Sequence, residues 1–173
     1  MNEIKPSEFK AISTERISDN KKISFEELKD SDMNTIEEIH SLFPQWNRLS
    51  VIKKLKHTQS GENMRFVARR NGKIVAHLKI IPGNSIHTHV AEMTSLIVSS
   101  KERGQGIGAG LMEYAISKIP KRINTLKLAV DKRNKTAISL YKKIGFEKYG
   151  LLENASKING EFIDNLLMVK KLK

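Results

Sequence analysis

The fold is decided by the stretch Leu96-Ile97-Val98-Ser99-Ser100-Lys101-Glu102-Arg103-Gly104-Gln105-Gly106-Ile107-Gly108-Ala109. It begins as an apolar strand, continues through a short polar turn and ends in a glycine-rich entry into a helix. Glycine lets a ligand approach the backbone closely, and the amide N–H groups at a helix N-terminus bind anions. This stretch therefore predicts a phosphate-binding site between a strand and a helix.

The composition is that of one globular domain. The chain has 173 residues, of which 39% are hydrophobic and 29% are charged, and this length suits a single core. It contains no cysteine and no apolar run long enough to span a bilayer. We therefore expect a cytoplasmic protein with no membrane partner, in which residues 1–21 are an N-terminal extension and residues 22–173 form one domain.

The net charge of +12 attracts anions such as nucleic acid or phosphorylated cofactors. The Lys and Arg residues are scattered, and aromatic residues are not interleaved with them as a surface for single-stranded nucleic acid would need. A lysine-rich surface more commonly serves solubility. Nucleic acid is therefore disfavoured as a partner.

Hydrophobic periodicity predicts a mixed α/β order of elements. Asn71-Gly72 predicts a type I′ turn between two strands. Asn134 is expected to cap a helix that Gly145 ends. In chain order, the sequence predicts a strand at 23–25, helices at 33–42 and 46–55, strands at 66–70, 73–80 and 88–98, a helix at 107–119, a strand at 126–130, a helix after 134, and a hairpin of strands 147–153 and 162–169.

Two other phosphate-binding motifs fit less well. Gly104-x-Gly106-x-x-Ala109 matches the dinucleotide fingerprint, and Asp131 ends a strand downstream. In a dinucleotide fold, however, the strand runs almost directly into the first glycine, whereas residues 99–103 intervene here. A P-loop is excluded because the chain has no Gly-x-x-x-x-Gly-Lys-Ser/Thr sequence.

Two motifs resemble the GNAT family of N-acetyltransferases, in particular its bacterial small-molecule members. Arg103-x-x-Gly106-x-Gly108 after an apolar strand is similar to the acyl-CoA loop of that family. Asn134-x-x-Ala137-x-x-Leu140-Tyr141 followed by Gly145-Phe146 is similar to a second family element. The resemblance covers about residues 23–169. It implies the α/β GNAT fold, with a mixed, mostly antiparallel central sheet that is splayed between two parallel strands and flanked by helices.

The resemblance also implies acetyl-CoA as the cosubstrate; a metal is not expected, because the chain offers too few ligands at useful spacing. Backbone amides of residues 104–109 would bind the pyrophosphate at the positive end of a helix. The N–H of Val98 would donate to the thioester oxygen. The full set of implied cofactor-binding residues is Leu96, Ile97, Val98, Arg103, Gly104, Gln105, Gly106, Ile107, Gly108, Ala109 and Asn134.

Two side chains are candidates for the chemistry of acetyl transfer. Tyr141 is the candidate general acid, because a phenol with a reference pKa of about 10 is protonated at neutral pH. Glu92 is the candidate base if its carboxylate is buried, and the alternative is an ordinary solvent-facing strand residue. His87 and His89 are expected on one strand face, but a metal site would need a third ligand nearby.

The expected function is transfer of an acetyl group from acetyl-CoA to a primary amine. A small-molecule acceptor is favoured because the segment from Asn159-Gly160-Glu161 to Met168 is similar to the last hairpin of small-molecule members. In addition, Ala129 stands where relatives that acetylate a ribosomal protein carry glutamate. Three alternatives stay open: acetylation of a protein N-terminus or lysine, a nucleotide-dependent oxidoreductase, and a non-catalytic module that binds CoA or nucleic acid. A homodimer is also a possibility, since dimers are common among such proteins.

Overall fold

The computed structural model describes residues 23–28, 33–42, 49, 63–158 and 160–172. The expected N-terminal extension lies outside the described residues. So does the helix predicted at 46–55, apart from Leu49.

The described strands form one seven-stranded sheet in the order β1-β2-β3-β4-β5-β7-β6. Strands β4 and β5 are parallel, and all the other neighbouring pairs in this sheet are antiparallel. The strands are β1 (Ile23–Glu27), β2 (Met64–Arg70), β3 (Lys73–Pro82), β4 (Val90–Val98), β5 (Thr125–Asp131), β6 (Glu147–Ile158) and β7 (Glu161–Lys171). The helices are α1 (Met33–Leu42), α3 (Ile107–Lys118) and α4 (Lys135–Lys143), with short 3-10 segments η2 (Ser85–His87) and η3 (Ser100–Glu102).

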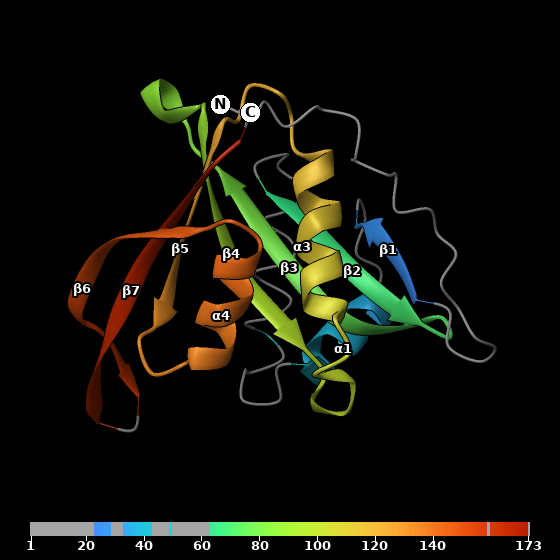
Figure 1. The fold of residues 1–173 in the computed structure, drawn as a ribbon. Coiled ribbons are helices and arrows are strands. Elements are labelled where there is room, and N and C mark those ends of the chain that lie inside the picture. The colour runs from blue at the N-terminus through green and yellow to red at the C-terminus, as the bar shows by residue number, and fades with distance from the viewer. Residues whose placement is uncertain (1–22, 29–32, 43–48, 50–62, 159, 173) are drawn as a thin grey trace, which may run out of the picture.

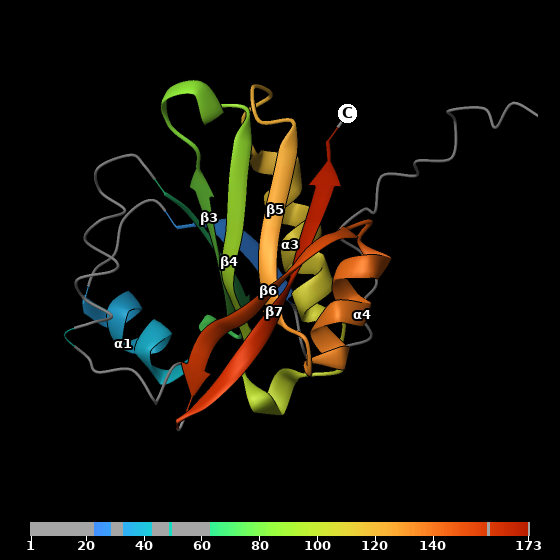
Figure 2. The ribbon, with the colours of Figure 1, turned by 90° about the vertical axis from the view of Figure 1, so that its left-hand side faces the viewer.

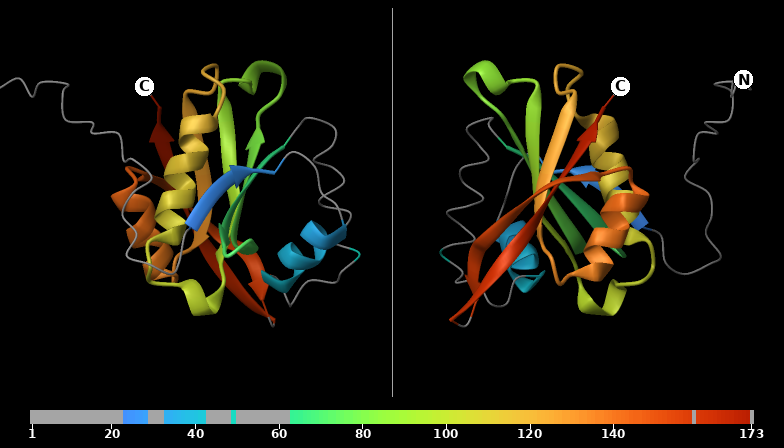
Figure 3. Two further views of the ribbon diagram at one scale, coloured as in Figure 1. Left: turned by 90° about the vertical axis from the view of Figure 1, so that its right-hand side faces the viewer. Right: turned by 60° about the vertical axis from the view of Figure 1, so that its left-hand side comes forward.

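Helices pack on both faces of the sheet. Helices α3 and α4 lie on one face and α1 lies on the other (Figures 2 and 3). The main core lies under α3 and includes Phe66, Leu78 and Leu111, all fully buried. A smaller core under α1 includes Ile39 and Val67. The face of the sheet opposite α3 therefore has its own apolar cluster, which lies beneath α1.

Strands β4 and β5 pair only where both begin. Their register partners are Val90 with Thr125, Ala91 with Leu126, and Glu92 with Lys127. Beyond these pairs β4 continues to Val98 beside β3, and β5 continues beside β7. The two strands consequently diverge from a fork, and α4 lies across the opening (Figure 1). This confirms the predicted splay.

Local sequence signals account for the turns and caps. Asn71 and Gly72 have φ angles of 51° and 79°, as a type I′ turn requires. The side-chain oxygen of Asn134 accepts a hydrogen bond of 3.0 Å from the Ala137 N–H and so caps α4. Gly145 follows α4 with a φ of 93°. These predictions are confirmed.

The connection between β3 and β4 differs from the prediction. Strand β4 begins at Val90, and η2 and a turn precede it. The prediction that His87 and His89 share a strand face is therefore wrong. Gly83 gives the physical reason, because a Cβ there would lie 2.3 Å from the His87 carbonyl oxygen. The chain folds back on itself at this glycine, and the strand alternation starts only after the fold.

A bulge in β4 lies beside a buried polar pair. The β3–β4 register shifts between His77 and Lys79, and Ser95 has a φ of 55°. The Arg65 Nη1 donates to His77 Nε2 at 3.1 Å. The hydrogen of the neutral ring is therefore on Nδ1, which lies 3.3 Å from the Ser95 carbonyl oxygen. Both side chains are buried, so this chain of contacts holds the bulge from inside the protein.

The buried imidazole of His77 is neutral at neutral and mildly acidic pH. Burial, together with the positive charges of Arg65 and Lys79, lowers the pKa of His77 to about 3. Burial also lowers the pKa of Arg65 to about 10, so the guanidinium stays charged at neutral pH. In the unfolded chain a histidine titrates near 6.5. Between about pH 6.5 and pH 3 the unfolded state binds more protons, so stability falls as the pH falls through that window.

We predict that His77→Gln weakens this pH dependence. Glutamine does not titrate, and its amide can still donate to the Ser95 carbonyl. The free energy of unfolding should therefore fall by about 2 kcal/mol less between pH 7 and pH 5 than in the unmodified protein. Urea denaturation at both pH values measures the difference, with the exposed His87→Gln as the control. An unchanged pH dependence in His77→Gln would contradict a neutral, buried His77.

Candidate active site

The glycine loop lies at the wide end of the gap between β4 and β5. Gly104 and Gly106 both have a φ of 77°, and a Cβ at either position would meet nothing within 4 Å. Gly106 is the N-cap of α3, and its carbonyl accepts the N–H of Gly110 at 3.0 Å. The N–H groups of residues 107–109 precede that first helical bond and have no acceptor within the helix. The loop therefore presents an open cradle of amide donors.

Side chains hold this loop from behind. The Arg70 Nη1 pairs with Glu102 Oε2 at 2.6 Å, and Nη2 of the same arginine donates to Gln105 Oε1 at 2.9 Å. The Gln105 Nε2 donates to Glu102 Oε2 at 3.2 Å. The Arg103 Nε donates to the Val98 carbonyl at 3.1 Å. The side chains of Gln105 and Arg103 thus brace the loop, and Arg70 and Glu102 are supporting residues that the sequence did not reveal.

The amide of Val98 faces the gap. The Ser99 N–H donates to the Val75 carbonyl at 2.8 Å. Backbone polar groups of successive strand residues point to opposite edges, so the Val98 N–H points away from β3. A Cβ on Gly108 would lie 3.4 Å from Val98 Cγ2, which places Val98 beside the start of α3. Val98 therefore lies at the cradle end of the gap and not at the fork.

The amide of Leu96 is closer to the fork and belongs to the bulge. Its N–H shares a peptide group with the Ser95 carbonyl, which faces the Nδ1 of His77. The C=O and N–H of a trans peptide point in opposite directions. Because His77 holds the carbonyl, the Leu96 N–H points away from His77.

Tyr141 lies on α4, across the opening. Its ring is partly buried and its centroid is 6.1 Å from that of Phe146. Its hydroxyl makes no hydrogen bond with any described residue. Burial raises the pKa of the phenol above its usual value, so it is protonated at neutral pH. The helix that lies across the opening therefore carries a protonated phenol.

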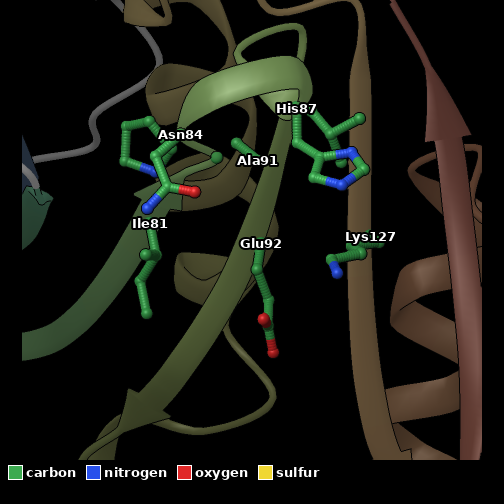
Figure 4. A pocket seen from close by; sticks show the side chains of 9 residues that line it. Ile81, Asn84, His87, Ala91, Glu92 and Lys127 are labelled. Carbon is green, nitrogen blue, oxygen red and sulfur yellow. The ribbon is translucent and has the colours of Figure 1, made fainter.

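Glu92 is exposed, so of the two alternatives the solvent-facing strand residue is the one the structure shows. Its neighbours Ala91 and Met93 are buried in the core under α3. Because side chains alternate along a strand, Glu92 lies on the face of the sheet opposite α3. Glu92 and Lys127 are the last register partners before the fork. Both line a cavity of about 240 Å³ below the β3–β4 connection (Figure 4).

Other kinds of site find little support. A dinucleotide site would use the carboxylate of Asp131. Here Arg133 donates two hydrogen bonds to it, from Nη2 to Oδ2 at 3.0 Å and from Nε to Oδ1 at 3.1 Å. These hydrogen bonds and the arginine charge lower the pKa of Asp131.

Among the described residues, no group of three or more His, Cys, Asp or Glu side chains is placed to hold a metal ion. In the same part of the chain, no helix has the length and apolarity to cross a membrane.

Curated relatives match part of this chain. The L-amino acid N-acetyltransferase AaaT of Escherichia coli (strain K12) is 32% identical over 107 residues, which are 60% of this chain and 65% of that protein. The spermidine N(1)-acetyltransferase of the same strain is 30% identical over 117 residues, which are 65% of this chain and 61% of that protein. The chain therefore spans less than two thirds of the length of either relative.

Solved structures share the fold over a larger part of the chain. The ribosomal-protein-alanine N-acetyltransferase of Brucella melitensis has a TM-score of 0.76 and 21% identity, covering 86% of this chain and 99% of that one. The yncA protein of Salmonella typhimurium, solved with its cofactor acetyl-CoA, has a TM-score of 0.74 and 14% identity, covering 87% and 94%. These likenesses confirm the predicted fold. Residues 28–146 match the acetyltransferase (GNAT) family, and the chain therefore belongs to that family.

Proposed function

We propose that this protein moves the acetyl group of acetyl-CoA to the primary amine of a small molecule. One observation carries the proposal: the gap between β4 and β5 has a glycine cradle at its wide end and a carboxylate, Glu92, at its fork. A gap of this kind can take an extended thioester along its length, with an anion at one end and an amine at the other. Membership of the GNAT family supports the same activity.

The residues present fit coenzyme A. The N–H groups at the start of α3 are proposed to bind its pyrophosphate, because Gly104 and Gly106 leave the space in front of them open. Val98 lies six residues beyond Glu92, about 20 Å along a strand, which gives an extended arm its path. The side-chain oxygen of Asn134 is used as a helix cap, so its amide N–H₂ is the group proposed to contact the cofactor.

The oxyanion donor is proposed to be the Leu96 N–H. The sequence pointed to Val98, but Val98 lies beside α3 and suits the pantetheine arm near the pyrophosphate. Leu96 is closer to the fork, and His77 fixes the direction of its N–H. A fixed donor of this kind contributes on the order of 3 kcal/mol, because it needs no reorganisation when charge develops on the thioester oxygen.

The proton transfers are assigned to Glu92 and Tyr141. Acetyl-CoA supplies the thioester: a nitrogen–carbon bond forms to the acetyl group, and the carbon–sulfur bond breaks. Glu92 takes the proton that the amine loses, directly or through water. The Tyr141 hydroxyl donates a proton to the departing sulfur; afterwards Glu92 releases its proton to solvent and Tyr141 takes one back. The products are the acetamide and free CoA, so atoms and charges balance.

A small acceptor is favoured over a protein. The cavity at the fork has a volume of about 240 Å³, which suits a small molecule. The likeness to a ribosomal-protein acetyltransferase, at 21% identity, concerns the fold alone.

A homodimer stays a prediction. The exposed apolar side chains of the β6–β7 hairpin are the surface that such a contact would use: Tyr149, Leu151, Leu152, Ile158 and Phe162.

We predict that acetyl-CoA stabilises the protein through the glycine cradle. At a hundred times its dissociation constant it should add about 2.7 kcal/mol to the free energy of unfolding, whereas NAD and ATP should add far less. Gly106→Ala strains a left-handed residue by about 1–2 kcal/mol and puts a methyl group in the cradle. Thermal shift with each ligand measures both effects.

Gly160→Ala is the matched control for the cradle. Gly160 has a φ of 86° and the same open surroundings, but it lies in the turn between β6 and β7. Both variants should lose similar intrinsic stability, and only Gly106→Ala should lose the acetyl-CoA shift. Equal loss of the shift in the two variants, or an equal shift with NAD, would refute the cradle assignment.

We predict that Tyr141→Phe lowers kcat by about 100-fold while the KM for acetyl-CoA is nearly unchanged, because phenylalanine keeps the ring and removes the proton donor. Thiol release with spermidine and the common L-amino acids as acceptors measures both parameters. Tyr149→Phe, at an exposed tyrosine of β6, is the control and should have no effect. A kcat equal to that of the unmodified protein would remove Tyr141 from the mechanism.

A further inference from the structure

Three neighbouring strands place an apolar, an acidic and a basic side chain side by side at the fork. Ile81 of β3 is the register partner of Glu92, which is in turn the partner of Lys127. Neighbouring strands lie about 4.8 Å apart, so the three side chains form a short row. All three line the cavity of about 240 Å³, on the same side of the sheet (Figure 4).

The two charges of this row are not used within the protein. In the part of the chain that the structure describes, neither the Glu92 carboxylate nor the Lys127 ammonium makes an ion pair or a side-chain hydrogen bond. Two other lysines near β5 do have partners. Lys171 donates to the Thr125 hydroxyl at 3.1 Å, and Lys132 pairs with a carboxylate at 2.7 Å. The row therefore offers one anion and one cation to a ligand.

We propose, as a refinement that rests on the function proposed above, that the acceptor is an α-amino acid bound as a zwitterion. Glu92 binds the ammonium, whose first proton leaves to solvent; Glu92 takes the second as the nitrogen–carbon bond forms, and Lys127 binds the carboxylate. A single carbon separates the two charged groups of an α-amino acid, which matches side chains that start from partners on adjacent strands. Ile81, Pro82 and Val90 line the rest of the cavity and give an apolar side chain its surroundings.

The orientation of this ligand suits the reaction. Glu92 is the last residue of β4 that pairs with β5, so an amine beside it lies where the gap begins and where the acetyl end of an extended thioester would stop. Two further polar side chains, Asn84 and His87, lie at the upper edge of the cavity, and both are exposed. Neither supplies a second carboxylate.

The same row argues against a polyamine. Spermidine carries only positive charges, and the Lys127 ammonium would repel any of them placed beyond Glu92. A polyamine site needs carboxylates where this cavity has a lysine. Lys127 is thus a specificity-determining residue, and it separates the two kinds of acceptor named by the curated relatives, an amino acid and spermidine.

The test compares acceptors with and without a carboxylate. Thiol release from acetyl-CoA is measured with the common L-amino acids, with the amide of the best of them, and with spermidine. We expect kcat/KM for the amino acid to exceed that for its amide at least tenfold. Lys127→Met should remove this preference, mainly through KM. Lys127→Glu should raise kcat/KM for spermidine, and Lys73→Met, which removes an exposed lysine at the β2–β3 turn, should change none of these values.

A binding measurement without turnover gives a second readout. With CoA in place of acetyl-CoA, the best amino acid should raise the melting temperature of the unmodified protein and of Lys73→Met, but not that of Lys127→Met. If the protein acetylates spermidine or the amide as well as any amino acid, the zwitterion assignment is overturned and the acetyltransferase assignment stands. If it binds acetyl-CoA but acetylates none of these amines, both assignments are overturned.

Discussion

The parting of β4 and β5 after only three register pairs is the constraint on which the rest of this structure depends. Paired strands satisfy each other's backbone groups, and polar backbone groups left unpaired in a protein interior are costly. Here the amide of Val98 faces an opening. If β4 and β5 were paired along their whole length, such amides would be hydrogen-bonded within the sheet. The unpaired edge is therefore useful only if another extended chain, such as a pantetheine arm, forms hydrogen bonds with it.

The opening persists because each of its walls is fixed on its other side. Strand β4 stays paired with β3, and β5 is paired with β7 from Thr125 to Asp131. Arg65 and His77 hold the bulge at Ser95, and the Arg70–Glu102–Gln105 cluster ties the glycine loop to the β2–β3 hairpin. The Arg65–His77 contact is buried and the Arg70–Glu102 pair is largely covered, so solvent screens these two less than it screens a surface ion pair. The site is thus preorganised by side-chain contacts behind its walls.

The sequence predicts what short-range chemistry decides. The glycine loop, the Asn71-Gly72 turn and the Asn134 cap each depend on a few adjacent residues, and the structure has all three. The bulge at Ser95 and the buried Arg65–His77 pair depend on the register of strands far apart in the chain, which no local pattern encodes. The same applies to Glu92. Alternation alone allowed either face, and only its neighbours Ala91 and Met93 in the core decide that the carboxylate is exposed.

Exposure changes what Glu92 can do. A buried carboxylate could have acted alone, as a base with a raised pKa in an apolar pocket. An exposed one needs its substrate to be held beside it, because proton transfer requires contact within hydrogen-bond reach or through one water. The register that sets Glu92 beside Lys127 meets this need. A ligand that carries both charges is held at two points, which fixes the nitrogen at the fork better than a single ion pair could. The proposed chemistry at the fork and the proposed acceptor therefore both depend on one alignment of β4 with β5.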